Sequence, residues 1–322
     1  MSVRIHGVPF STEEQLDCFT LALESLLRFY GLELVHLHFD EWFFSCQRDA
    51  DQVRLMAQTR DFPVSLARFG VELCRRQEAD FAGGWGEVRA ELRQGRPALA
   101  LLDTYYLRPY YYPGRPIHQP HALIPTGYGP EGVWLVDPSP YTAFAGSIPL
   151  EGFARAWGME EFFEWWQLRV PTGVALPAPE VLLEGLWQNL DRMLGSGEEG
   201  QGVEGIRRLA GMIEEAGEWT QERISPWLGQ CAQFKWVGLA RRKHAEFLAH
   251  AGERLGRGCL GQVGAELKGV AQEWMVGRNL ALKGSRKQGR EMAGRLARRL
   301  CAIADREEQL LLRLAGVLEE WT

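Results

Sequence analysis

The sequence predicts an α+β fold, in which a domain built on an antiparallel sheet is followed by an all-α helical domain. Short apolar runs separated by turn residues fill the segment between about 97 and 168, as in a sheet. Three prolines within 171–179 are typical of a linker. Beyond them, apolar residues recur at the three- and four-residue spacing of amphipathic helices. We therefore expect domains at about 1–172 and 178–322.

Composition places the chain among ordinary globular proteins. Its 322 residues are 46% hydrophobic and 24% charged, with a net charge of −6, a mixture unlike that of disordered or fibrous chains. It has no run of the roughly 18 apolar residues that a membrane-spanning helix needs, and its first residues lack the apolar core of a signal peptide. We expect a cytoplasmic protein that does not bind membranes.

The elements of the first domain follow from periodicity and turn signals. A helix over 18–30 ends at Gly31, and a hairpin turn at Gly129–Gly132 joins two strands. Further helices are predicted at 50–59, 85–94 and 150–157, and strands at 97–102, 122–128, 132–136, 143–148 and 162–168. Segments such as Val181–Leu190 and Glu307–Trp321 indicate five or six helices in the second domain.

Cys18 is the first candidate for chemistry. Asp17 is a suitable N-cap, which would put Cys18 in the first turn of its helix, where the helix dipole favours a thiolate. The capping box Ser11–Glu14 could instead start the helix earlier and leave Cys18 in the second turn. The six cysteines are scattered without zinc-type spacing, so we expect reduced thiols, no metal and no bound cofactor.

A histidine and an acid complete the candidate constellation. His121 opens one strand of the predicted hairpin and Asp137 closes the other, so antiparallel pairing brings them side by side. A cysteine nucleophile needs such an imidazole, and the imidazole needs an orienting acceptor. Alternatively, Asp137 belongs to a turn and the histidines to a surface loop. His118 remains an alternative base to His121.

The order of cysteine, histidine and acid resembles the papain-like superfamily, and more narrowly its bacteriocin-processing peptidases. The segments His121–Asp137 and Ser147–Trp157 are similar to the butirosin biosynthesis protein H family, N-terminal domain. The run Leu101–Tyr110, with an aspartate followed by tyrosines, and the all-helical second half also fit that family. The resemblance implies a papain-like fold for the first domain.

The resemblance also implies an activity. Members of this kind would pass an acyl or aminoacyl group from a carrier-protein thioester, held on a 4'-phosphopantetheine arm, to a small-molecule amine in antibiotic or other secondary metabolism. Cys18 would engage the thioester, His121 would move the proton and Asp137 would hold the ring. Gln15 and the Cys18 N–H would form the oxyanion hole, and the substrate would contact Asp103, Tyr105, Tyr106 and His118.

Basic residues are dense between Arg278 and Arg299. We expect Lys283, Arg286, Lys287 and Arg290 to dock an acidic acyl or peptidyl carrier protein or its phosphate, although a basic helix is often only a solvated face. The acidic net charge argues against nucleic acid. A cysteine peptidase or amidase of the same fold, and a degenerate non-catalytic scaffold, are the alternative functions.

Overall fold

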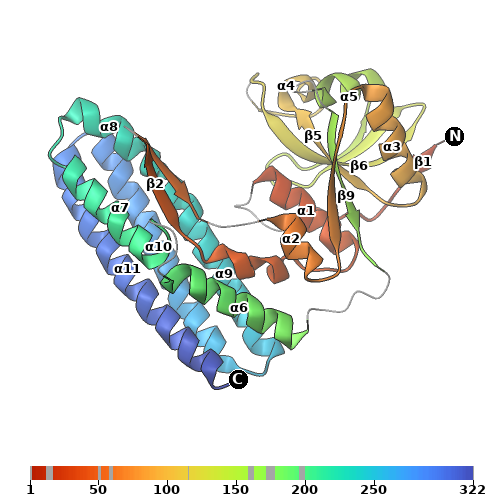
Figure 1. Ribbon diagram of the computed structural model, residues 1–322. Helices are drawn as coiled ribbons and strands as arrows, with labels where there is room; N and C mark the ends of the chain where they lie inside the picture. The colour runs from red at the N-terminus through yellow and green to blue at the C-terminus, as the bar shows by residue number, and fades with distance from the viewer. Residues whose placement is uncertain are drawn as a thin grey trace. The chain divides into compact units, whose positions relative to one another are not determined.

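The computed structural model describes residues 2–11, 17–49, 52–57, 61–114, 116–158, 163–171, 178–195 and 200–321. Its contacts divide the chain into two compact units (Figure 1). Unit 1 comprises Met1–Leu34 and Phe62–Leu176, and unit 2 comprises Val35–Asp61 and Pro177–Thr322. The predicted fold class, an antiparallel-sheet domain followed by a helical region, is confirmed.

Unit 1 contains a seven-stranded sheet in the order β4-β9-β5-β6-β7-β8, with β1 paired to β6. Every pairing in it is antiparallel. The strands are β1 (Val3–Arg4), β4 (Glu72–Glu78), β5 (Ala98–Asp103), β6 (Pro120–Gly129), β7 (Gly132–Asp137), β8 (Phe144–Ile148) and β9 (Phe163–Arg169). The hairpin of β6 and β7 forms as predicted, with Gly129 paired to Gly132.

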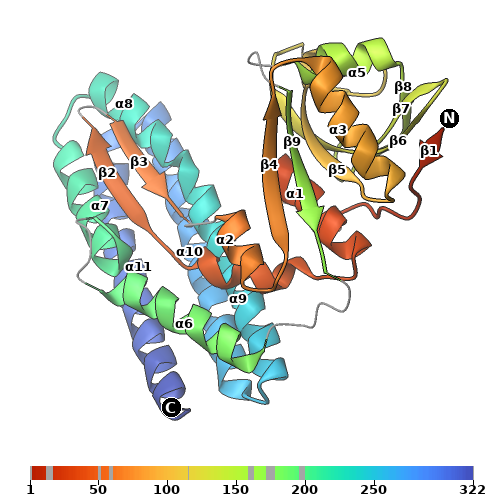
Figure 2. The same ribbon diagram turned by 45° about the vertical axis from the view of Figure 1, so that its right-hand side comes forward.

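Helices cover both faces of this sheet. They are α1 (Cys18–Phe29), α2 (Phe62–Ala67), α3 (Phe81–Arg93), α4 (Thr104–Leu107) and α5 (Leu150–Trp157). The core between the sheet and the pair α3 and α5 contains Trp85, Phe153 and Trp165. Phe19 of α1 packs on Trp166, 4.9 Å between ring centroids. Because neighbouring strand residues point to opposite faces, α1 lies on the face opposite α3 and α5 (Figure 2).

Unit 2 is a bundle of long helices with a two-stranded hairpin against it (Figure 2). The α-helices are α6 (Pro179–Leu194), α7 (Gly202–Ala216), α8 (Gln221–Gln230), α9 (Phe234–Arg254), α10 (Gly258–Arg286) and α11 (Gly289–Glu319), with a short 3-10 helix at Cys231–Gln233. Within the described residues these six agree with the expected number. The hairpin, β2 (Ser45–Asp49) and β3 (Gln52–Met56), follows a 3-10 helix at Leu34–Glu41.

The segment Val35–Asp61 belongs to unit 2, which differs from the uninterrupted domains 1–172 and 178–322 expected from sequence. Its aromatic side chains explain why. Trp42 and Phe44 are fully buried, and Phe44 stacks on Trp274 with 5.5 Å between centroids. The Cys46 N–H donates to the Gly200 carbonyl at 2.9 Å. The bundle therefore buries this early segment as part of its own core.

One local prediction was wrong, and some strands of the sheet were not predicted. The segment 50–59 was expected to be helical, but its residues Gln52–Met56 form strand β3, in which Val53 is buried between the exposed Gln52 and Arg54. Strand β4 was not predicted, because its Arg75, Arg76 and Gln77 interrupt any apolar pattern. No helix in the described part of the chain is long and apolar enough to span a membrane.

Candidate active site

Cys18 is the first residue of α1. Asp17 caps the helix: its Oδ1 accepts the Thr20 backbone N–H at 2.9 Å and its Oδ2 accepts the Thr20 hydroxyl at 2.7 Å. The helix therefore begins at Cys18 rather than at the alternative capping box, whose first residue, Ser11, instead donates its hydroxyl to Glu24. Since the first N–H groups of a helix have no partner within it, Cys18 lies at the positive end of the helix dipole.

The hairpin of β6 and β7 brings His121 and Asp137 together as predicted. His121 Nε2 lies 2.8 Å from Asp137 Oδ2, and Asp137 Oδ1 accepts the Ser139 N–H at 3.1 Å. Asp137 is 0% exposed and His121 is 6% exposed. Both carboxylate oxygens are therefore engaged, and the aspartate can fix the orientation of the imidazole ring.

His121 also interacts with Cys18. Burial lowers the pKa of His121, but hydrogen bonds to Asp137 and Cys18, with the negative charges of both, outweigh burial and raise the pKa to about 9. With Nε2 bonded to Asp137, Nδ1 is the nitrogen left to face the sulfur. The interactions of His121 thus link the three side chains expected from sequence, here called the Cys18–His121–Asp137 line.

Aromatic side chains enclose this line. The Tyr112 ring packs edge-on against His121, 5.3 Å between centroids, and Tyr111 stacks on Phe144 at 4.1 Å. Burial and the nearby charge of Asp137 raise the pKa of Tyr111 well above its usual range. The sequence does not single out Phe144, which looks there like any other strand residue.

A second histidine–aspartate pair lies beside the first. His118 Nδ1 is 2.6 Å from Asp103 Oδ2, and the Tyr105 ring stacks on His118 with 4.4 Å between centroids. Tyr106 meets His118 edge-on at 5.9 Å. The four residues expected to contact substrate therefore form one cluster. His121, rather than His118, is the histidine that interacts with Cys18.

The predicted oxyanion hole is only partly described. Gln15 lies outside the residues that the structure describes. The N–H groups of Cys18 and Phe19, at the first turn of α1, have no partner within the helix and are suitable donors for an oxyanion. Among the described residues no cluster of three or more histidine, cysteine or acidic side chains could hold a metal ion.

The basic residues expected to dock a carrier protein lie where α10 ends and α11 begins. Lys283, Arg286, Lys287 and Arg290 are all exposed. Arg290 is partly neutralised, since it pairs with Glu218 and donates from Nε to the Gly217 carbonyl at 3.2 Å.

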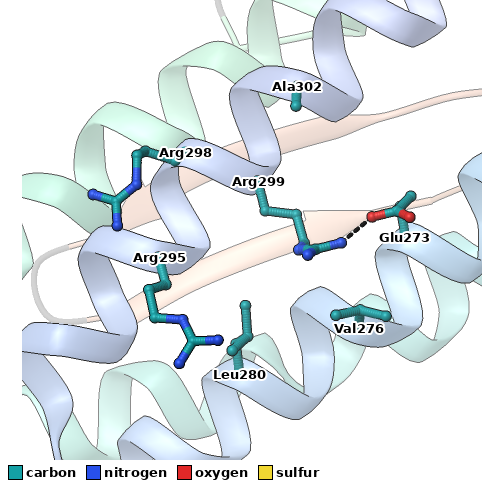
Figure 3. Close-up of a pocket in the computed structure, with 7 residues that line it drawn as sticks. All are labelled: Glu273, Val276, Leu280, Arg295, Arg298, Arg299 and Ala302. Carbon is teal, nitrogen blue, oxygen red and sulfur yellow. Dashed lines mark hydrogen bonds and ion pairs between the residues drawn. The ribbon is translucent and has the colours of Figure 1, made fainter.

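A groove of about 590 Å³ lies between the same two helices (Figure 3). Val276 and Leu280 of α10 contribute apolar surface, and Arg299 pairs with Glu273 across the groove. Arg295 and Arg298 complete its basic side. The basic surface therefore extends from the helix ends along the groove.

Taken together, the first turn of α1 and the β6–β7 hairpin carry a candidate cysteine–histidine–aspartate site on an antiparallel sheet. The butirosin biosynthesis protein H, N-terminal, family matches residues 17–138, which include all three side chains. The resemblance expected from sequence is thus confirmed over these residues. Site and family match indicate a cysteine-dependent enzyme.

The comparison with solved structures found three similar chains, one of which is described next. The crystal structure of a C39-like peptidase from Bacillus anthracis is similar at 14% identity, with a TM-score of 0.36, over 53% of this chain and 100% of the other. No curated protein matches the chain.

Proposed function

We propose that the protein is an acyltransferase of secondary-metabolite biosynthesis, which moves an acyl or aminoacyl group from a carrier-protein thioester to an amine. The observation that carries the proposal is the Cys18–His121–Asp137 line inside the segment that matches the butirosin family. A cysteine suits this chemistry, because exchange between two thioesters is nearly balanced in energy and conserves the activated acyl group.

The reaction has two halves. Cys18 attacks the carbonyl of the donor thioester as a thiolate, and the C–S bond to the donor breaks. His121 supplies the proton that the departing thiol takes up, and Asp137 holds the imidazole. The N–H groups of Cys18 and Phe19 stabilise the negative oxygen of the tetrahedral adduct. An amine then attacks the Cys18 thioester, which forms the amide and releases the sulfur.

The donor in this proposal is a carrier protein with its 4'-phosphopantetheine arm. Carrier proteins of this kind are acidic, and the exposed cations Lys283, Arg286 and Lys287 offer complementary charge. The phosphate of the arm would also favour arginine and lysine donors. The protein itself holds no cofactor in this scheme.

The test uses an N-acetylcysteamine thioester as a mimic of the pantetheine arm. Intact-protein mass spectrometry should show one acyl group per chain, which peptide mapping places on Cys18. Addition of an amine should discharge it as the amide, and Cys18→Ala should abolish both steps. Acylation of Cys18 followed only by hydrolysis, with every amine, would instead indicate a peptidase or amidase. Failure of any thioester or ester to label Cys18 would indicate a non-catalytic scaffold.

A further inference from the structure

Asp103 and His118 form a pair that has no role in the reaction proposed for Cys18, His121 and Asp137. The Asp103 side chain is 2% exposed, and its Oδ1 accepts the backbone N–H groups of Tyr105 at 3.0 Å and Gln119 at 3.3 Å. Its Oδ2 lies 2.6 Å from His118 Nδ1. The carboxylate is thus held from both sides and can direct one imidazole nitrogen.

The imidazole is fixed although it is exposed. The side chain of His118 is 61% exposed, and its ring stacks on Tyr105. The loop carrying it is tied to the start of α4, since Thr104 donates its N–H to Gln119 at 3.0 Å and its hydroxyl to Ile117 at 3.1 Å. Capping of α4 needs only the Oδ1 bond to Tyr105, so it does not account for the histidine. Because Nδ1 faces Asp103, Nε2 is directed away as a proton acceptor.

The Asp103–His118 pair lies close to His121. In the ladder between β5 and β6, Leu102 is opposite His121 and Asp103 is opposite Pro120. His121 is three positions after His118, which limits their Cα–Cα distance to about 10 Å. Both histidine–aspartate pairs therefore sit at the same end of three neighbouring strands, β5, β6 and β7, within the reach of one small substrate.

We propose that His118, oriented by Asp103, is the base that deprotonates the acceptor amine, an inference that rests on the acyl transfer proposed above. An amine arrives as an ammonium ion and loses two protons before it becomes an amide. His118 takes the first, which frees the nitrogen lone pair for attack on the Cys18 thioester. His121 takes the second from the tetrahedral adduct as the C–S bond breaks, which returns Cys18 and His121 to the state in which they began the reaction.

His118 and His121 differ in solvent exposure, and this difference suits them to different proton transfers. His121 is buried and exchanges its proton only with the reacting groups, whereas the exposed His118 can release its proton to water after each turnover. The titratable groups around His118 are Asp103, Tyr105 and Tyr106, with the Arg155 guanidinium 5.6 Å from the Tyr106 ring centre. Water as acceptor loses only one proton in the step that breaks the thioester, so His118 favours transfer to amines over hydrolysis.

The test compares two amines that differ in charge. Cys18 is acylated with p-nitrophenyl acetate, whose released p-nitrophenol measures the first half-reaction. Hydroxylamine is largely uncharged at neutral pH, and ethanolamine is an ammonium ion there. His118→Gln should slow discharge by ethanolamine about 100-fold, and should slow acylation and discharge by hydroxylamine far less. The loss should shrink at alkaline pH, where ethanolamine itself loses its proton.

Asp103→Asn tests the positioning residue, because asparagine can still cap α4. It should slow discharge by ethanolamine less than His118→Gln does. Discharge by hydroxylamine should again be much less affected. Equal loss with both amines, or no loss with ethanolamine, would overturn the proposal for His118. Absence of a p-nitrophenol burst and of an adduct on Cys18 in the unaltered protein would instead refute the acyl transfer on which it rests.

Discussion

At the scale of single residues, the decisive feature is a buried imidazole that is more basic than histidine in water. The His121 pKa is raised to about 9 because Asp137 and Cys18 both favour its charged form. An unfolded histidine has a pKa of about 6.5. The folded protein therefore holds a proton on His121 throughout a range of pH in which the unfolded chain has lost it.

This difference predicts how stability depends on pH. Below pH 6.5 both states are protonated and the stabilising contribution is complete. Between about 6.5 and 9 the folded state binds more protons, so the free energy of unfolding attributable to His121 falls as pH rises, by at most about 1.4 kcal/mol per pH unit. Above 9 the contribution is gone. Urea denaturation at pH 6.5 and 9 should show this loss, and His121→Gln should remove it. An equal loss in the variant would assign it to another group.

The places of the candidate site residues could be predicted from sequence because each occupies an element end with a recognisable signal. Asp17 precedes an apolar helix, and His121 and Asp137 flank a hairpin whose glycines fix its register. The pairing of His118 with Asp103 carried no such signal. It depends on the path of the loop between α4 and β6, which turn chemistry alone does not determine.

At the scale of the element, the start of α1 controls where the sulfur is held. The cap by Asp17 fixes the first turn, whose N–H groups and dipole act on Cys18. Asp80 caps α3 in the same way, accepting the Gly83 N–H at 2.8 Å, and α3 carries none of the three reacting side chains. The two caps are therefore chemically matched but differ in function.

Asp17→Ala should destabilise the protein by about 1 kcal/mol and also slow acylation of Cys18 at least several-fold, because a frayed first turn misplaces the sulfur. Asp80→Ala should cost a similar amount of stability with no change in acylation. Urea unfolding and the p-nitrophenol burst give the two readings. If both variants slowed acylation equally, the effect would be one of stability rather than of position.

The structure of the hairpin β2–β3 depends on contacts that its own sequence does not indicate. The N–H of Gly202 donates to the Phe44 carbonyl at 2.8 Å, and the N–H of Val53 donates to Gln230 Oε1 at 2.8 Å. These partners lie more than 150 residues away, so the local pattern was ambiguous between helix and strand. Tertiary contacts decided the outcome.

At the scale of the whole molecule, a buried charge ties the early segment to the helical unit. Glu307 of α11 is 0% exposed and accepts from three donors: the Arg241 guanidinium, Trp42 Nε1 at 2.9 Å and Trp274 Nε1 at 2.9 Å. Arg241 also donates to the Phe43 carbonyl. One carboxylate thus joins α9, α10 and α11 to the segment that sequence placed in the other domain.

Removal of this carboxylate should be costly. Glu307→Ala leaves Arg241 and two indole N–H groups buried without their acceptor, for which we expect a loss of about 3–5 kcal/mol. The double variant Arg241→Met with Glu307→Leu should lose less, since no charge is stranded. Urea unfolding followed by tryptophan fluorescence measures both. A double variant as unstable as the sum of its single variants would show that the residues act independently.

The basic surface where α10 ends and α11 begins is expected to contribute to binding of a carrier protein. Charge at an interface acts mainly on encounter, so its removal should raise KM for a carrier-bound thioester and spare the small N-acetylcysteamine thioester. Lys283→Glu is expected to raise the former several-fold, and the effect should fade at high salt as charges are screened. Lys268→Glu, a charge reversal at an exposed position on the same helix, is the matched control.

Both substrates must be compared in each variant, because a change in KM for the small thioester would mean that Lys283 affects the active site itself. Equal behaviour of the two variants with the carrier substrate would leave the surface as an ordinary solvated helix end.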